Sequence, residues 1–113
     1  MVDLLQITPR PTAVFVASDT AALGALRAIR RGGLRVPEDL ALVGFDDVPL
    51  VELVDPPLTT IRLPAYGLGW GAADMLIRLI AKEDVRQPCV ILETELIVRK
   101  SCGADSTYTQ KGR

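Results

Sequence analysis

Residues 13–45, AVFVASDTAALGALRAIRRGGLRVPEDLALVGF, hold the strongest structural signal in the chain. They begin with a short apolar run, 13–17, and end with a second one, 40–45. Continuous apolar runs of this length favour strands buried on both faces of a parallel sheet. Between them, residues 21–31 are rich in Ala, Leu and Arg, which are strong helix formers, and Gly32-Gly33 is typical of a helix end. The order strand, helix, strand predicts a right-handed βαβ unit with parallel strands.

The flanking segments extend this α/β pattern. Residues 1–7 are expected to form the end of a helix. Residues 58–63 are β-prone and end at a proline. Apolar residues at helical spacing predict a further helix from Pro64 or Ala65 to about Lys82. Residues 90–98 are β-prone again, with glutamates alternating with apolar residues as in a strand that has one wetter face.

Composition narrows the function classes. The formal net charge is -1, with no histidine, whereas a nucleic-acid-binding module usually has a clear basic excess. The chain also has no G-x-S-x-G motif and no cysteine beside a basic partner. We therefore expect no DNA binding by this chain itself, no enzymatic activity, no metal and no cofactor.

The cysteines, the first residues and the length of the apolar runs predict the compartment in which the protein resides. The two cysteines, Cys89 and Cys102, lie outside any metal-binding spacing and favour reduced thiols, with a disulfide as the alternative. The first residues lack the basic and apolar regions of a signal peptide. No apolar run approaches the roughly 18 residues that span a bilayer. These features predict a cytoplasmic protein without a membrane partner.

Polar side chains follow both predicted strands of the βαβ unit. Ser18 and Asp19 follow the first strand, and Asp46 and Asp47 follow the second. Ligands of open parallel sheets bind beyond the carboxyl ends of the strands, where these residues converge. The Asp46 carboxylate can accept hydrogen bonds from both hydroxyls of a vicinal diol, as in a sugar. Helix capping by the first pair, turn formation by the second and a Mg²⁺ site are the alternatives.

Two apolar surfaces allow two interpretations. The helix at 20–31 and the stretch 50–54 hold more apolar residues than a small fragment easily buries. They are either ordinary core or an interface at which the same patch meets itself across a two-fold axis.

Several segments together are similar to LacI/GalR transcriptional regulators. The similarity covers residues 1–101 and is carried by PTAVFVASD at 11–19, VGFDD at 43–47 and PPLTTI at 56–61. The resemblance implies the C-terminal part of an effector-binding domain with a type I periplasmic-binding-protein-like, Rossmann-like, three-layer α/β fold and a parallel sheet. Residues 102–113 are expected to form a flexible tail.

The resemblance also implies roles for individual residues. The positions that match effector contacts or lie near them are Ser18, Asp46, Arg62 and Leu63. The positions that match a dimer interface are Leu23, Arg27, Leu50 and Val54. Ser18 stands where asparagine is common in the family, and Leu63 stands where several members have a polar residue. In the intact fold the helix after Pro64 crosses to the other subdomain, so we expect its apolar surface to be exposed in this chain.

The resemblance implies a ligand sensor that forms a homodimer, takes a sugar or related polyol as its effector, and binds DNA only through a headpiece missing before Met1. A fragment of a periplasmic sugar-binding protein of an ABC transporter is the alternative, and an enzyme using Asp46 and Asp47 is the third hypothesis.

Overall fold

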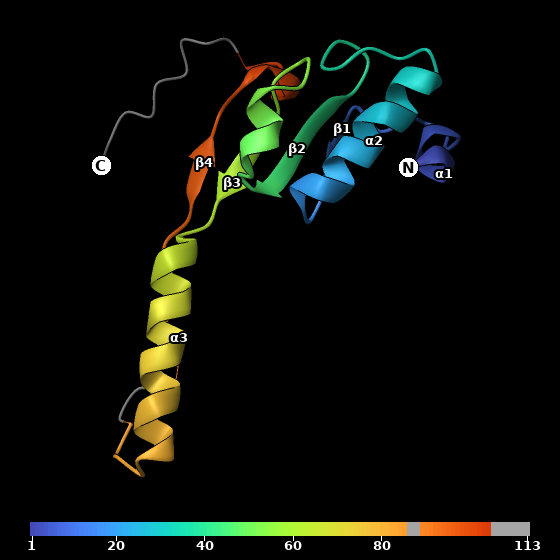
Figure 1. The fold of residues 1–113 in the computed structure, drawn as a ribbon. Coiled ribbons are helices and arrows are strands. Elements are labelled where there is room, and N and C mark those ends of the chain that lie inside the picture. Colours follow the sequence, from blue (N-terminus) through green and yellow to red (C-terminus); the bar gives the residue numbers. More distant parts are fainter. Residues whose placement is uncertain (86–88, 105–113) are drawn as a thin grey trace. The chain divides into compact units, whose positions relative to one another are not determined.

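The strand–helix–strand unit expected from residues 13–45 is present. Strand β1 (Ala13–Phe15) leads to helix α2 (Asp19–Arg31) and then to strand β2 (Ala41–Asp46). The two strands are parallel, with Val14 opposite Leu42. Figure 1 shows α2 lying across the sheet that they begin. The prediction of a parallel βαβ unit is confirmed.

The computed structural model describes residues 1–85 and 89–104, and these residues complete a four-stranded sheet in the order β1-β2-β3-β4. Strand β3 (Thr59–Arg62) pairs in parallel with β2, and β4 (Glu95–Ile97) is the fourth strand. The short helix α1 (Val2–Leu5) packs against α2. Two 3-10 helices, η1 (Pro49–Glu52) and η2 (Lys100–Cys102), complete the elements around the sheet.

Helix α2 forms because its ends are capped and charged as a helix requires. The Ser18 side chain accepts a hydrogen bond from the Ala21 amide, 3.3 Å away, which satisfies a free N–H group of the first turn. Arg30 and Arg31 lie in the last turn, where cations interact favourably with the helix dipole. Gly32 caps the C-terminus, and the next residue, Gly33, has the positive φ of 74° that only glycine adopts easily.

One face of the sheet packs against α2 and makes the core. The fully or nearly fully buried apolar residues are Ala22, Ala25, Leu26, Ile29, Val36, Leu40, Leu42, Val51 and Leu58. In β2 the side chains alternate, with Leu42 and Gly44 buried. In β1, Ala13 and Phe15 point to the same face of the sheet and are exposed, so nothing in the described residues covers that face at β1. The prediction that both strands are buried on both faces is therefore wrong for β1.

The chain divides into two units, Met1–Arg62 with the segment from Leu96 on, and Leu63–Glu95. Helix α3 (Ala65–Ile80) makes up most of the second unit and agrees with the predicted helix. None of its residues is buried, and exposed side chains include Trp70 and Ile77, so the expected apolar surface is confirmed. In the described part of the chain, no helix combines the length and apolar character that crossing a membrane requires.

The C-terminal elements are shorter than expected. The β-prone stretch 90–98 forms a strand only at Glu95–Ile97, and residues 89–94 have no regular secondary structure. Ser101 is buried: its hydroxyl donates to the Leu42 carbonyl at 2.6 Å and accepts from the Thr59 amide at 2.8 Å. Cys102 belongs to η2, so the described start of the expected tail is part of the fold. The rest of that tail, residues 105–113, lies outside the described residues.

Substituting Gly44 tests the packing between the sheet and α2. A Cβ atom at this position would overlap the Asp19 carboxylate and lie 3.0 Å from the Leu58 side chain. We expect Gly44→Ala to lower the free energy of unfolding by about 1–3 kcal/mol, the usual cost of overpacking a core. Urea denaturation measures the change. The control is Gly24→Ala in α2, where a Cβ atom meets nothing within 4 Å and alanine should stabilise the helix. Equal effects of the two substitutions would contradict the packing.

Candidate functional site

One buried carboxylate joins the segment after β1, the segment after β2 and the middle of β3. Asp19 follows β1, and its side chain accepts a hydrogen bond from the Val48 amide after β2, at 2.9 Å. Its other oxygen accepts from the Thr60 hydroxyl in β3, at 2.7 Å. Asp19 is 0% exposed. Residues 18–19 and 46–48 therefore share one edge of the sheet, as expected from the parallel pairing.

Ser18 lies at this edge, half-buried, as the N-cap of α2. The capping alternative raised for it from the sequence is correct, since its oxygen accepts the Ala21 amide. A hydroxyl group can still donate its own hydrogen while its oxygen accepts. Capping therefore leaves Ser18 able to offer one hydrogen bond to a ligand.

Asp46 is the last residue of β2 and differs from its acidic neighbours. Its φ is 118° and that of Asp47 is 60°, two successive values that residues other than glycine seldom adopt. Asp46 is half-buried, and its carboxylate has no hydrogen-bond or ion-pair partner among residues 1–85 and 89–104. This edge of the sheet therefore offers an anionic acceptor that the described residues do not engage.

Asp47 is turned into the protein and is neutralised there. Its side chain is 6% exposed and lies 2.7 Å from Arg62 Nε and 2.8 Å from Arg99 Nη2. Burial alone would raise the pKa of this carboxyl group, but its contacts with the Arg99 and Arg62 cations outweigh burial and lower the pKa. Asp47 thus belongs to the internal structure of the turn.

Arg62 closes β3 directly opposite Asp46 in the strand register. Its side chain is half-exposed and is held by Asp47, so the structure brings it to the same edge as Asp46. Leu63 is half-buried and is the first residue of the second unit. Arg99 was not predicted from the sequence, because nothing local distinguishes a cation two residues after a short strand.

The four predicted interface residues lie on the first unit. Leu23, Arg27 and Val54 line a shallow hollow of about 550 Å³, together with Leu26, Arg30, Arg31 and Asp55. Leu50 is 53% exposed in η1. Leu53, which was not predicted, is even more exposed. Apolar side chains at these positions are thus accessible in the single chain.

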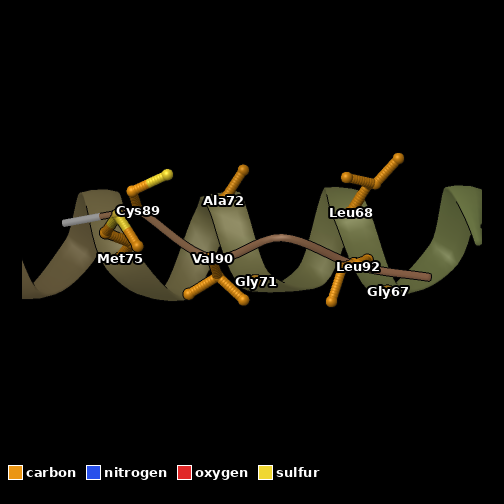
Figure 2. A pocket seen from close by; sticks show the side chains of 8 residues that line it. All are labelled: Gly67, Leu68, Gly71, Ala72, Met75, Cys89, Val90 and Leu92. Atoms are coloured by element: carbon orange, nitrogen blue, oxygen red, sulfur yellow. The ribbon is translucent and has the colours of Figure 1, made fainter. Parts of the chain in front are cut away.

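The second unit contains a groove of a different chemistry. It has a volume of about 330 Å³ and is lined by Gly67, Leu68, Gly71, Ala72, Met75, Cys89, Val90 and Leu92. Figure 2 shows the segment 89–92 running along α3, with Leu68, Met75 and Val90 among the labelled side chains. None of these side chains is charged, so the groove offers nothing comparable to Asp46. The described residues also include no group of three or more potential metal ligands.

The lowered pKa of Asp47 predicts a pH-dependent stability. Its charged form is stabilised by folding, so this contribution is complete above the unfolded pKa of about 3.9 and is lost as the pH falls through the lower folded pKa. We expect Asp47→Asn to be less stable than the wild type near neutral pH, by on the order of 1–3 kcal/mol. The difference should shrink in acid.

Urea denaturation over a pH series checks this expectation. Asp46→Asn is the matched control, because it removes the same charge next to Asp47 without breaking an ion pair of the described residues. A difference between wild type and Asp47→Asn that stays constant below pH 4 or so would contradict the role of the charge.

Comparison with known proteins agrees with this architecture. The periplasmic binding protein-like domain family matches residues 1–102. The HTH-type transcriptional repressor CytR of Escherichia coli K12 is 44% identical over 104 residues, which are 92% of this chain and 30% of that repressor. The chain thus spans about a third of the length of the curated relatives that it matches.

Solved structures give the same result. The transcriptional regulator CelR, determined as a cellobiose complex, superposes with a TM-score of 0.78 and 42% identity over 86% of this chain and 30% of that one. The lac repressor dimer bound to operator and the anti-inducer ONPF superposes with a TM-score of 0.79 and 38% identity over 91% of this chain and 36% of that one. The parts of known proteins that this chain matches come from transcriptional repressors and regulators, and the chain itself belongs to the periplasmic binding protein-like domain family.

Proposed function

We propose that this chain is the ligand-sensing part of a cytoplasmic transcriptional regulator and that it binds a sugar-like polyol at the carboxyl edge of its sheet. The observation that carries the proposal is the Asp46 carboxylate, which has no partner among the described residues. The neighbouring carboxylates of Asp19 and Asp47 are both engaged inside the protein. Asp46 is therefore the acidic group at this edge that remains for a ligand.

The chemistry of the edge suits a hydroxylated molecule. A carboxylate has two acceptor oxygens and can take both hydroxyls of a diol, and charged acceptors make the stronger hydrogen bonds. Ser18 adds a hydroxyl donor at the end of the neighbouring strand. A half-buried acceptor also disfavours analogues that lack the hydroxyl, because the carboxylate would be left unpaired.

Arg62 and Leu63 complete the proposed contacts. Arg62 stands opposite Asp46 in the register and keeps half of its side chain exposed while Asp47 holds it. Leu63 follows it at the point where the second unit begins. Leu63 is included as a proposed contact because it directly follows Arg62 in the chain.

The regulator assignment is favoured over a transport protein. The similar proteins named above are a repressor, a regulator and the lac repressor bound to its operator. In this proposal DNA is bound by a part of the protein other than these 113 residues, whose net charge of -1 does not favour DNA. The cellobiose complex of CelR supports a sugar as the ligand class.

We further propose that Leu23, Arg27, Leu50 and Val54 form a homodimer interface. Apolar atoms at these positions are accessible, and the hollow that three of them line lies beside the exposed stretch after η1. A patch of this kind can meet its own copy across a two-fold axis. The structure of the lac repressor is that of a dimer.

Replacing Asp46 tests the ligand site. In the full-length protein, Asp46→Ala should weaken binding of the effector by about 5- to 150-fold, because about 1–3 kcal/mol of charged hydrogen bonds is removed. A thermal-shift screen of mono- and disaccharides, cellobiose included, identifies the sugar, and calorimetry measures the affinity. Asp39→Ala is the control, since Asp39 precedes β2 at its other end and pairs with Arg35. Equal affinities of wild type and Asp46→Ala would remove Asp46 from the site.

Introducing a charge at Leu50 tests the interface. Leu50→Glu would place a carboxylate in the proposed dimer contact, where burying an unpaired charge is costly. We expect the dimer to dissociate at least about tenfold more readily, measured by sedimentation equilibrium. Thr12→Glu adds the same charge at an exposed position before β1 and should leave association unchanged. A wild-type protein that stays monomeric at high concentration would contradict the interface.

A further inference from the structure

The chain passes between its two units at two points, and one carboxylate holds an arginine next to each of them. It leaves the first unit after Arg62, the last residue of β3, and returns at Leu96 in β4. Arg99 follows the end of β4 by two residues. Asp47 forms ion pairs with both arginines, at 2.7 Å and 2.8 Å. Residues distant in sequence are thus joined at a single side chain.

The arrangement around Arg99 fixes that side chain firmly. Arg99 is 11% exposed, and besides Asp47 it reaches the Leu58 carbonyl at 2.9 Å and the Glu52 carboxylate at 2.7 Å. Its backbone amide and carbonyl are both hydrogen-bonded to the Thr59 hydroxyl. A buried cation with this many partners has essentially one position, because losing a partner leaves an uncompensated charge. Asp47 is therefore anchored to a rigid point beside β3 and β4.

Asp46 lies in a turn whose next two residues, Asp47 and Val48, are both held by contacts with other elements. On one side, Asp47 is held by the arginines. On the other side of the turn, the Val48 amide is held by the buried Asp19 carboxylate. Asp46 and Asp47 both have positive φ, a strained conformation that persists only where the surroundings enforce it. The ion pairs of Asp47 hold the turn in this conformation. In that conformation the Asp46 carboxylate has no partner among the described residues.

We propose that Asp47 is a positioning residue that couples the Asp46 turn to both strands through which the chain passes between its units. The functional consequence rests on the proposed function, in which Asp46 contacts the effector. A ligand that pulls on Asp46 shifts the turn, and the turn is attached through Asp47 to the end of β3 and to the segment after β4. An event at the ligand site is thereby transmitted to both connections at once. In this proposal the ion pairs of Asp47 with Arg62 and Arg99 are the contiguous contacts that carry the coupling.

Hydrogen exchange of the ligand-free, full-length protein tests the coupling directly. In Asp47→Asn we expect the amides of residues 46–48, of Leu63 and of residues 96–98 to exchange at least about tenfold faster. The amides of Leu26 and Ile29 in α2 should change much less. Asp47→Glu keeps the charge and should restore part of the protection against exchange. This variant separates the effect of losing the charge from a general failure of the protein to fold. The control is Asp55→Asn, which breaks an exposed ion pair with Arg30 and should leave these amides unchanged.

Combining variants distinguishes coupling from general destabilisation. If Asp47 acts through the two arginines, adding Asp47→Asn to the double variant Arg62→Gln and Arg99→Gln should not accelerate exchange any further, because the contacts that Asp47 makes are already lost. Additive effects, or faster exchange confined to residues 46–48, would overturn the proposal. Failure of the proposed function is a separate outcome: coordinated exchange changes together with unaltered sugar binding by Asp46→Ala would reject the ligand site and keep the coupling.

Discussion

The buried carboxylate of Asp19 connects the elements at the edge of the sheet where the candidate ligand site lies. It accepts one hydrogen bond from the backbone after β2 and another from a threonine hydroxyl in β3, while its own backbone starts α2. A carboxylate without solvent is stable only when its oxygens are satisfied in this way. Gly44 lies beside it because any side chain there would occupy the same space. This one contact therefore ties the segment after β1 to the segment after β2 and to β3.

Three aspartates at one edge of the sheet have three different environments. Asp19 is fully buried and accepts neutral donors, and Asp47 is nearly buried and faces two arginines. Asp46 is half-buried with no partner in the described ranges. Identical chemical groups therefore differ in their availability to a ligand. Their neighbours decide that availability, so residue type by itself does not distinguish a binding carboxylate from a structural one.

The second unit has the opposite character. Helix α3 has apolar residues over much of its surface and none of them is buried, and the groove beside it has no charged lining residue. Contiguous exposed apolar surface of this kind commonly marks a site of contact with another part of a protein or with a partner. The relatives are about three times longer than the region that matches this chain.

The sequence alone determined the local elements and their chain order. Apolar runs, strong helix formers, capping residues and glycine stops act over a few residues, so β1, α2, β2, β3 and α3 could be predicted, and so could the gathering of Ser18, Asp19, Asp46 and Asp47 at one edge. Only the tertiary structure decided the rest. It showed that β1 is an exposed edge strand, that β4 is short, and that Arg99 and Asp47 form an ion pair. Burial and charge pairing join residues about fifty positions apart, and no local pattern contains that information.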